Sequence, residues 1–141
     1  MGELPIADEL NYWKSGKSSP ESWLDKVEKM ITDVGGTVNT RLMGRLGDYE
    51  GIMFGFRIGT ESYKITWPVL PPKNDKDWPA ARRQAATMVY HDTKAKMVSY
   101  RIFGPKVVFS NWLVAPDGKT LAERVPSEIA NALNDIKLIT Q

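Results

Sequence analysis

The stretch YKITWPVLPP at residues 63–72, together with the alanine-rich segment after it, decides how this chain folds. Tyr63, Ile65 and Trp67 alternate with polar residues, which indicates a strand with one buried face. The prolines of the same stretch end that strand, because proline cannot donate a hydrogen bond to a sheet. Residues 77–104 then have the composition of a long helix. This region therefore predicts a strand, a rigid exit and a helix that packs back onto the sheet.

One side of the long helix is made of small residues, which would let it approach a sheet closely. The residues that share this side, at 100° per residue, are Ala81, Ala85, Met88, Asp92, Ala95 and Ser99. Residues 98–103 also alternate apolar and polar positions, so a strand competes with the helix there. Asp92 would be costly to bury unpaired. We expect it to accept a hydrogen bond from a sheet or loop amide or to lie at the edge of the packed stripe, or else to be a site carboxylate with a raised pKa.

A first helix and a three-stranded meander are expected before this region. Ser19 and Pro20 predict the start of the helix, and the pair of glycines at 35 and 36 predicts its end. The apolar face of the helix is made of Trp23, Leu24, Val27, Met30, Ile31 and Val34. Strands are expected at residues 37–45, 52–58 and 63–67, with glycine-containing turns between them.

The pattern of the first two strands makes two finer predictions. Alternation along the first strand places Val38, Thr40 and Leu42 together on the buried side of the sheet. Gly55 in the second strand lies opposite the apolar side, so it marks a bulge or a close approach of another group.

The ends of the chain complete the expected organisation. Residues 1–18 show no sustained period and predict a flexible N-terminal arm, while residues 19–141 have the length of a single domain. Pro105 begins a short helical piece that reaches Leu113, and a last helix is expected from residue 125. The predicted fold class is therefore α+β: a three-stranded antiparallel meander packed by an N-terminal helix and a long central helix, with C-terminal helical pieces.

Composition excludes several classes of function. The chain has no cysteine and a single histidine, His91, which removes disulfides, thiolate nucleophiles and the usual zinc ligand sets. We therefore expect no metal, no cofactor and no enzymatic activity. No apolar run approaches the ~20 residues of a membrane span, and the first residues lack the pattern of a signal peptide. A cytoplasmic protein with no membrane partner is expected.

The charge distribution provides the strongest functional hint. Residues 73–106 hold eight lysines and arginines against three aspartates, although the whole chain carries a net charge of only +2. On a continuous helix, the residues that lie close to one line are Arg83, Tyr90, Lys94 and Arg101, with Arg82 and Lys96 on the flanks. No acid interrupts this line. The pattern predicts a non-enzymatic protein that binds nucleic acid through its phosphates, without sequence preference.

Two other classes of function remain open. A protein-interaction or self-assembly module would use an aromatic edge around Trp67, Trp78 and Trp112, and exposed rings there would favour it. A small enzyme would use the neighbouring His91 and Asp92, and it would need a defined pocket beside them.

Two resemblances accompany these patterns. The order helix, three-strand meander, helix resembles the double-stranded-RNA-binding domain, in which Arg82 and Arg83 match the place of phosphate-binding lysines. An acidic turn at residues 47–50 stands where that family has a proline–histidine loop, so the likeness concerns topology. The exit at residues 67–71, the Lys-Ala-Lys triplet at 94–96 and the turn at 116–120 are similar to small uncharacterised proteins of phages and integrated mobile elements, over roughly residues 20–125. That second resemblance implies no activity.

Overall fold

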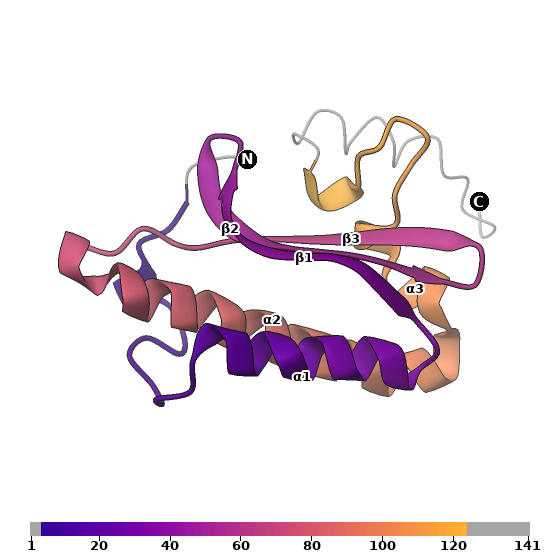
Figure 1. Cartoon of the computed structure of the whole chain (residues 1–141), viewed down its shortest axis with the longest axis horizontal. Coiled ribbons are helices and arrows are strands. Elements are labelled where there is room, and N and C mark those ends of the chain that lie inside the picture. Colours follow the sequence, from indigo (N-terminus) through magenta and orange to yellow (C-terminus); the bar gives the residue numbers. More distant parts are fainter. Residues whose placement is uncertain (1–3, 124–141) are drawn as a thin grey trace, which may run out of the picture.

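The computed structural model describes residues 4–123 as two helices packed against one face of a three-stranded sheet (Figure 1). The main elements in chain order are α1 (Pro20–Asp33), β1 (Thr37–Leu46), β2 (Tyr49–Ile58), β3 (Glu61–Pro68), α2 (Trp78–Phe103) and α3 (Pro105–Val108). Single 3₁₀ turns add η1 (Ala7–Glu9), η2 (Asp75–Asp77), η3 (Ser110–Trp112) and η4 (Leu121–Glu123). The predicted α+β fold is confirmed, and so is the helical state of residues 98–103.

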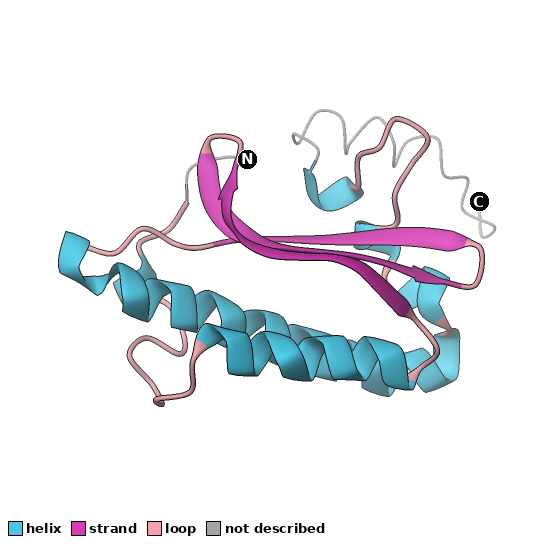
Figure 2. Ribbon diagram, viewed as in Figure 1, coloured by secondary structure: helices cyan, strands magenta, loops and turns pink. Residues whose placement is uncertain are grey.

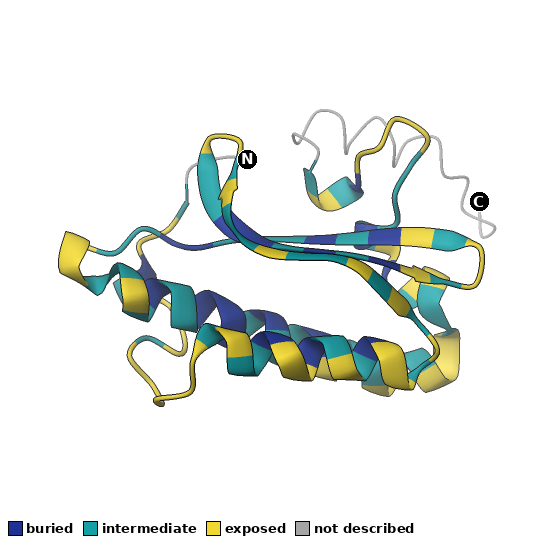
Figure 3. Cartoon of the chain, in the orientation of Figure 1, coloured by how far each residue is buried: buried dark blue, intermediate teal, exposed yellow. Residues whose placement is uncertain are grey.

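The sheet is an antiparallel meander in the order β1-β2-β3, and α1 and α2 run side by side beneath it (Figure 2). The core lies between these layers, and buried positions occur on both the sheet and the helices (Figure 3). Its largest fully buried members are Trp112, Tyr63, Phe54, Phe56, Phe109, Ile31, Ile52 and Ile65. Burial of one such side chain contributes about 1.5–3 kcal/mol, so this layer is the main source of stability.

The start of α1 follows the predicted chemistry. The Ser19 hydroxyl accepts a hydrogen bond from the backbone N–H of Ser22 at 3.2 Å, and Pro20 occupies the first turn. Such a cap is worth about 1 kcal/mol. From the predicted apolar face, Leu24, Val27 and Ile31 are buried.

A bulge in β1 changes which of its residues face the helices. The register shifts between Val38 and Thr40, which then pairs with Gly55. A Cβ atom on Gly55 would stand 2.7 Å from the side-chain oxygen of Asn39, so this glycine marks both a bulge and a close approach, as predicted. Beyond the bulge the alternation is reversed. The prediction that Leu42 shares the buried side with Val38 is wrong, because one extra residue turns Leu42 outward, where it is 37% exposed.

The segment before α1 lies against α2, although the sequence predicts little fixed structure there. Ala7 is fully buried, and its N–H donates to the carbonyl of Pro71 at 2.9 Å. The buried Gln84 amide donates to the carbonyls of Ala7 and Asn11, at 2.9 and 3.0 Å. These bonds join the arm to the loop after β3 and to the first half of α2, and so help to form the site described below.

The chain after α2 packs against the third strand. Phe109 is fully buried beside Tyr63 and Trp112, and the N–H of Val114 donates to the carbonyl of Ser62 at 3.0 Å, at the edge of β3. The predicted helical piece after Pro105 is present as α3 and η3. The last predicted helix, from residue 125, lies outside the described residues. Among the helices that the structure describes, none combines the length and apolarity needed to cross a membrane.

Candidate nucleic-acid interface

The basic line predicted from the sequence lies on a single helix. Helix α2 continues without interruption to Phe103, and Gly104 ends it with a φ of 79°. Arg83 and Arg101 are 18 residues apart, a rise of about 27 Å along the axis at 1.5 Å per residue. The helical spacing on which the prediction depended is therefore present.

The cations at the C-terminal end of this line are exposed, whereas the one at its N-terminal end is partly buried. Lys94 and Arg101 are exposed, and neither forms an ion pair with any of residues 4–123. Arg83 is only half-exposed, and its Nε is buried without a hydrogen-bond partner in the described part of the chain. The accessible cations are therefore those of the second half of α2.

The two flanking cations, Arg82 and Lys96, already form ion pairs within the molecule. Arg82 Nε lies 2.9 Å from the Glu50 carboxylate of β2. Lys96 Nζ lies 2.8 Å from Asp92 and 4.6 Å from the centre of the Trp112 ring. Asp92 is thus paired with an ammonium group one helical turn away and is partly exposed, which agrees with a position at the edge of the packed stripe and not with a bond to a backbone amide. The Arg82–Glu50 pair and the contact of Lys96 with Trp112 hold α2 to its surroundings, and a nucleic acid would have to compete with both ion pairs.

An aromatic cluster that the sequence did not reveal borders the open cations. Tyr90 packs against Trp23 of α1 with ring centres 4.9 Å apart. Two ammonium groups flank the Tyr90 ring, that of Lys94 at 5.8 Å and that of Lys26 at 5.6 Å, and Lys26 also lies 4.6 Å over Trp23. The sequence places Lys26 on the outer side of the first helix, but it carries no sign that this side meets the tyrosine of the second.

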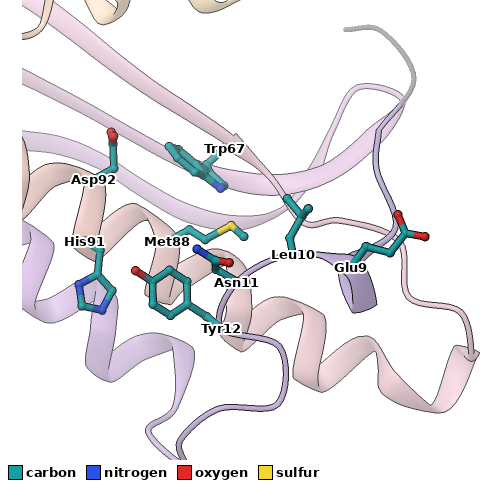
Figure 4. A pocket seen from close by; sticks show the side chains of 8 residues that line it. All are labelled: Glu9, Leu10, Asn11, Tyr12, Trp67, Met88, His91 and Asp92. Atoms are coloured by element: carbon teal, nitrogen blue, oxygen red, sulfur yellow. The ribbon is translucent and has the colours of Figure 1, made fainter.

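A hollow of about 570 Å³ opens beside this cluster, between the N-terminal arm, the end of β3 and α2 (Figure 4). Trp67 and Met88 contribute its apolar lining, and Tyr12, His91 and Asp92 line it as well. The ring of Tyr12 stacks on the His91 imidazole, with centres 4.8 Å apart and planes 9° apart. Tyr12 adopts a φ of 67°, in the left-handed region that residues other than glycine seldom occupy.

The hollow provides the defined pocket beside His91 and Asp92 that an enzyme there would need. Among the described residues no group hydrogen bonds to His91, which makes only ring contacts. Asp92 is engaged by Lys96. A nucleophile held by the histidine and oriented by the carboxylate, as covalent catalysis requires, is not assembled within residues 4–123.

The aromatic edge expected for a protein-interaction module is not exposed. Trp112 is buried, and Trp67 and Trp78 are partly buried against the core. A different apolar surface is open instead, at the corner where α2 meets α3. It is made of Val98, Ile102, Phe103 and Val107, which are between 60% and 72% exposed. The sequence signal for it is the alternation at residues 98–103, which had suggested a strand.

No protein-family model, no curated protein and no solved structure matches this chain. The order α1-β1-β2-β3-α2 agrees with the topology expected from the resemblance to the double-stranded-RNA-binding domain. The resemblance to proteins of phages and integrated elements stays a prediction. A functional proposal therefore rests on the geometry of α2 and its neighbours.

Proposed function

We propose that this protein binds nucleic acid through its phosphate groups, without sequence preference and without catalysing a reaction. The observation that carries the proposal is that Lys94 and Arg101 lie exposed on one line of α2, with no carboxylate of the described chain beside them. Seven residues separate them, a rise of roughly 10 Å, which reaches beyond a single phosphate. Cations in such an arrangement release counterions from a phosphate backbone on binding.

The contrast with α1 supports this proposal. On the exposed surface of α1, Lys29 Nζ lies 2.8 Å from Asp33 in an i,i+4 pair, the usual arrangement of a solvated helix. Arg41 reaches down to the same helix and lies 2.7 Å from Asp25. The line on α2 has no such interleaved acid. Lys94 and Arg101 are thus available to an anion without loss of an ion pair within the described chain.

The aromatic cluster adds a second component. The Tyr90 and Trp23 rings lie together with their planes tilted by 49°, and Lys26 and Lys94 border them. Rings and cations in alternation are typical of surfaces that follow a nucleic-acid chain, since bases stack on rings while phosphates approach the ammonium groups. Arg83, half-buried at the far end, and the paired Arg82 and Lys96 are assigned smaller contributions.

Titration of labelled single-stranded and double-stranded oligonucleotides at ~50 mM salt tests the proposal, and binding should fall steeply towards ~200 mM. The variant Lys94→Gln/Arg101→Gln should weaken binding about tenfold or more and reduce the salt slope by about 2. The matched control is Lys29→Gln/Lys106→Gln. It removes the same charge from cations that already have partners, Asp33 and Glu61.

Two results would contradict the proposal. One is the absence of any binding by the wild-type protein at low salt. The other is an equal loss in the control variant, which would reduce the effect to overall charge and remove the special role of α2.

A second candidate function, a protein-interaction or assembly module, is favoured by the open apolar corner. A patch of four large apolar side chains is unusual on a monomer and often marks a contact surface. Sedimentation velocity over a range of concentrations tests it. The first proposal would be replaced by this one if the wild-type protein associates but binds no oligonucleotide. The variant Val98→Asn/Ile102→Asn should then lose the association.

A further inference from the structure

We infer, on the basis of the proposed function, that the preferred nucleic acid is single-stranded and that one unpaired base enters the hollow beside Tyr12 and Trp67. The first observation is proximity. His91 lines the hollow, and Lys94 follows it by three residues on the same helix. Side chains at that spacing are neighbours, with Cβ atoms about 5–6 Å apart. A nucleotide whose phosphate lies on Lys94 therefore has the mouth of the hollow within reach of its base.

The lining of the hollow has the chemistry of a base-binding site. Trp67 and Tyr12 offer flat ring surfaces, Met88 offers a polarisable thioether, and these side chains follow one another across the hollow (Figure 4). A flat heterocycle stacks on such surfaces with little regard to its identity. In a duplex the faces of the bases are already stacked on each other. Only an unpaired or extruded base can enter.

Tyr12, which supplies one ring of the hollow, is held in place before any ligand binds. Tyr12 keeps its left-handed backbone while its ring rests on His91. The buried Gln84 amide fixes the residue before Tyr12, because its N–H groups donate to carbonyls of the arm, among them that of Asn11 at 3.0 Å. A strained residue that buried bonds maintain is a common feature of binding sites. Here it presents one aromatic ring at the edge of the hollow.

The polar wall indicates which bases are favoured. Asp92 donates no hydrogen bond when ionised, and only its Oδ2 atom is engaged by Lys96, at 2.8 Å. The other oxygen can accept from an exocyclic amino group, as carboxylates do from the amino group of cytosine. Glu9 adds a second acceptor on the arm side. We therefore expect cytosine to be preferred over thymine, which has no exocyclic amino group.

The test compares oligo(dC), oligo(dT) and a duplex of the same length, each labelled and titrated against the full chain at low salt. The decisive variant is Tyr12→Gly, because glycine accepts a φ of 67° without strain and only the ring is lost. Tyr12→Phe, which keeps the ring, is the matched control. Thermal melting checks that both variants fold.

We expect the wild-type protein to bind oligo(dC) roughly fivefold to a hundredfold more tightly than the duplex, the range of one stacked base. Tyr12→Gly should lower the affinity for the single strand by a similar factor and leave duplex binding unchanged, and Tyr12→Phe should behave like the wild type. Asp92→Asn should narrow or reverse the preference for oligo(dC) over oligo(dT), since an amide also donates.

The possible failures are distinguishable. Equal binding of the single strand and the duplex, with no effect of Tyr12→Gly, would overturn the assignment of the hollow and leave phosphate binding by α2 intact. A failure to bind any of the three oligonucleotides would overturn the proposed function and this inference together.

Discussion

The two halves of α2 differ in how they are covered, and the difference separates stability from function. From Ala81 to Val89 nearly every residue is buried or half-buried, because the arm, α1 and the sheet surround this half (Figure 3). From Lys94 onward only the inner side is covered, and Val98 and Ile102 are more than 70% exposed. One continuous helix thus supports the core with its first half and presents a free surface with its second.

The comparison shows that the second half of α2, from Lys94 onward, is not a loosely held extension of the helix. Exposed apolar side chains gain nothing from the fold in the free protein, and a β-branched residue such as Val98 lowers helix propensity. The inner side still anchors the segment, through Tyr100 beside Phe109 and through the Lys96 ammonium over the Trp112 ring. These contacts fix the second half of α2 on the core while its outer side stays exposed.

The largest expected effect comes from the same substitution in the two halves. Val89 is fully buried, so Val89→Ala removes two methyl groups from the core and should lower the free energy of unfolding by about 2–3 kcal/mol. Val98 is 71% exposed, so Val98→Ala should change stability by less than about 0.5 kcal/mol, with a slight gain from helix propensity. Urea denaturation followed by circular dichroism measures both. Equal losses in the two variants would mean that the second half is covered in solution.

A second pair probes the packing of the small face. Ala85 is buried, so Ala85→Leu should overpack the contact and cost ~1–3 kcal/mol. Ala95 was expected on the same face but is exposed, so Ala95→Leu should be neutral within about 0.5 kcal/mol. Thermal melting of the two variants checks this. An unchanged midpoint for Ala85→Leu would contradict the packing of the first half.

The fold could be predicted from the sequence because its signals are local. The cap at Ser19, the prolines after Trp67 and the glycine at 104 mark element ends through backbone chemistry that does not depend on distant contacts. The facing of Leu42 could not be predicted, since one extra residue at the bulge reverses the alternation and the bulge is set by the neighbouring strand.

The candidate site could be predicted only where it lies on one helix. The spacing of Lys94 and Arg101 follows from helical geometry, so the sequence identified their common line. Trp23 and Tyr12 approach α2 from distant parts of the chain, and no periodicity within either segment shows which residue of α2 they meet. The exposure of Ala95 has the same origin, because among the described residues the arm does not reach this position and no other segment covers it.

The smallest expected effect concerns the inner side of the second half of α2, where the core contains an unsatisfied hydroxyl. Tyr63 is buried against Phe56 and Phe109, and its hydroxyl has no hydrogen-bond partner in the part of the chain that the structure describes. Tyr63→Phe removes only that oxygen and should raise stability by up to about 1 kcal/mol near neutral pH. A loss instead would show that the hydroxyl is bonded in solution.

The pH dependence of the same pair of proteins sharpens the comparison. Burial, and secondarily the charge of Glu61, raises the pKa of Tyr63 above its ordinary value of 10.0. The folded state then keeps this proton at a pH where the unfolded chain has released it, so stability is complete below about pH 10 and falls above it. Tyr63→Phe should lessen that alkaline loss in thermal melts. Tyr49, whose pKa burial also raises, is present in both proteins and cancels in the difference. Identical alkaline profiles would show that Tyr63 ionises as freely in the folded protein as in the unfolded chain. Solvent would then reach the inner side of the second half of α2 more easily than the inner side of its first half.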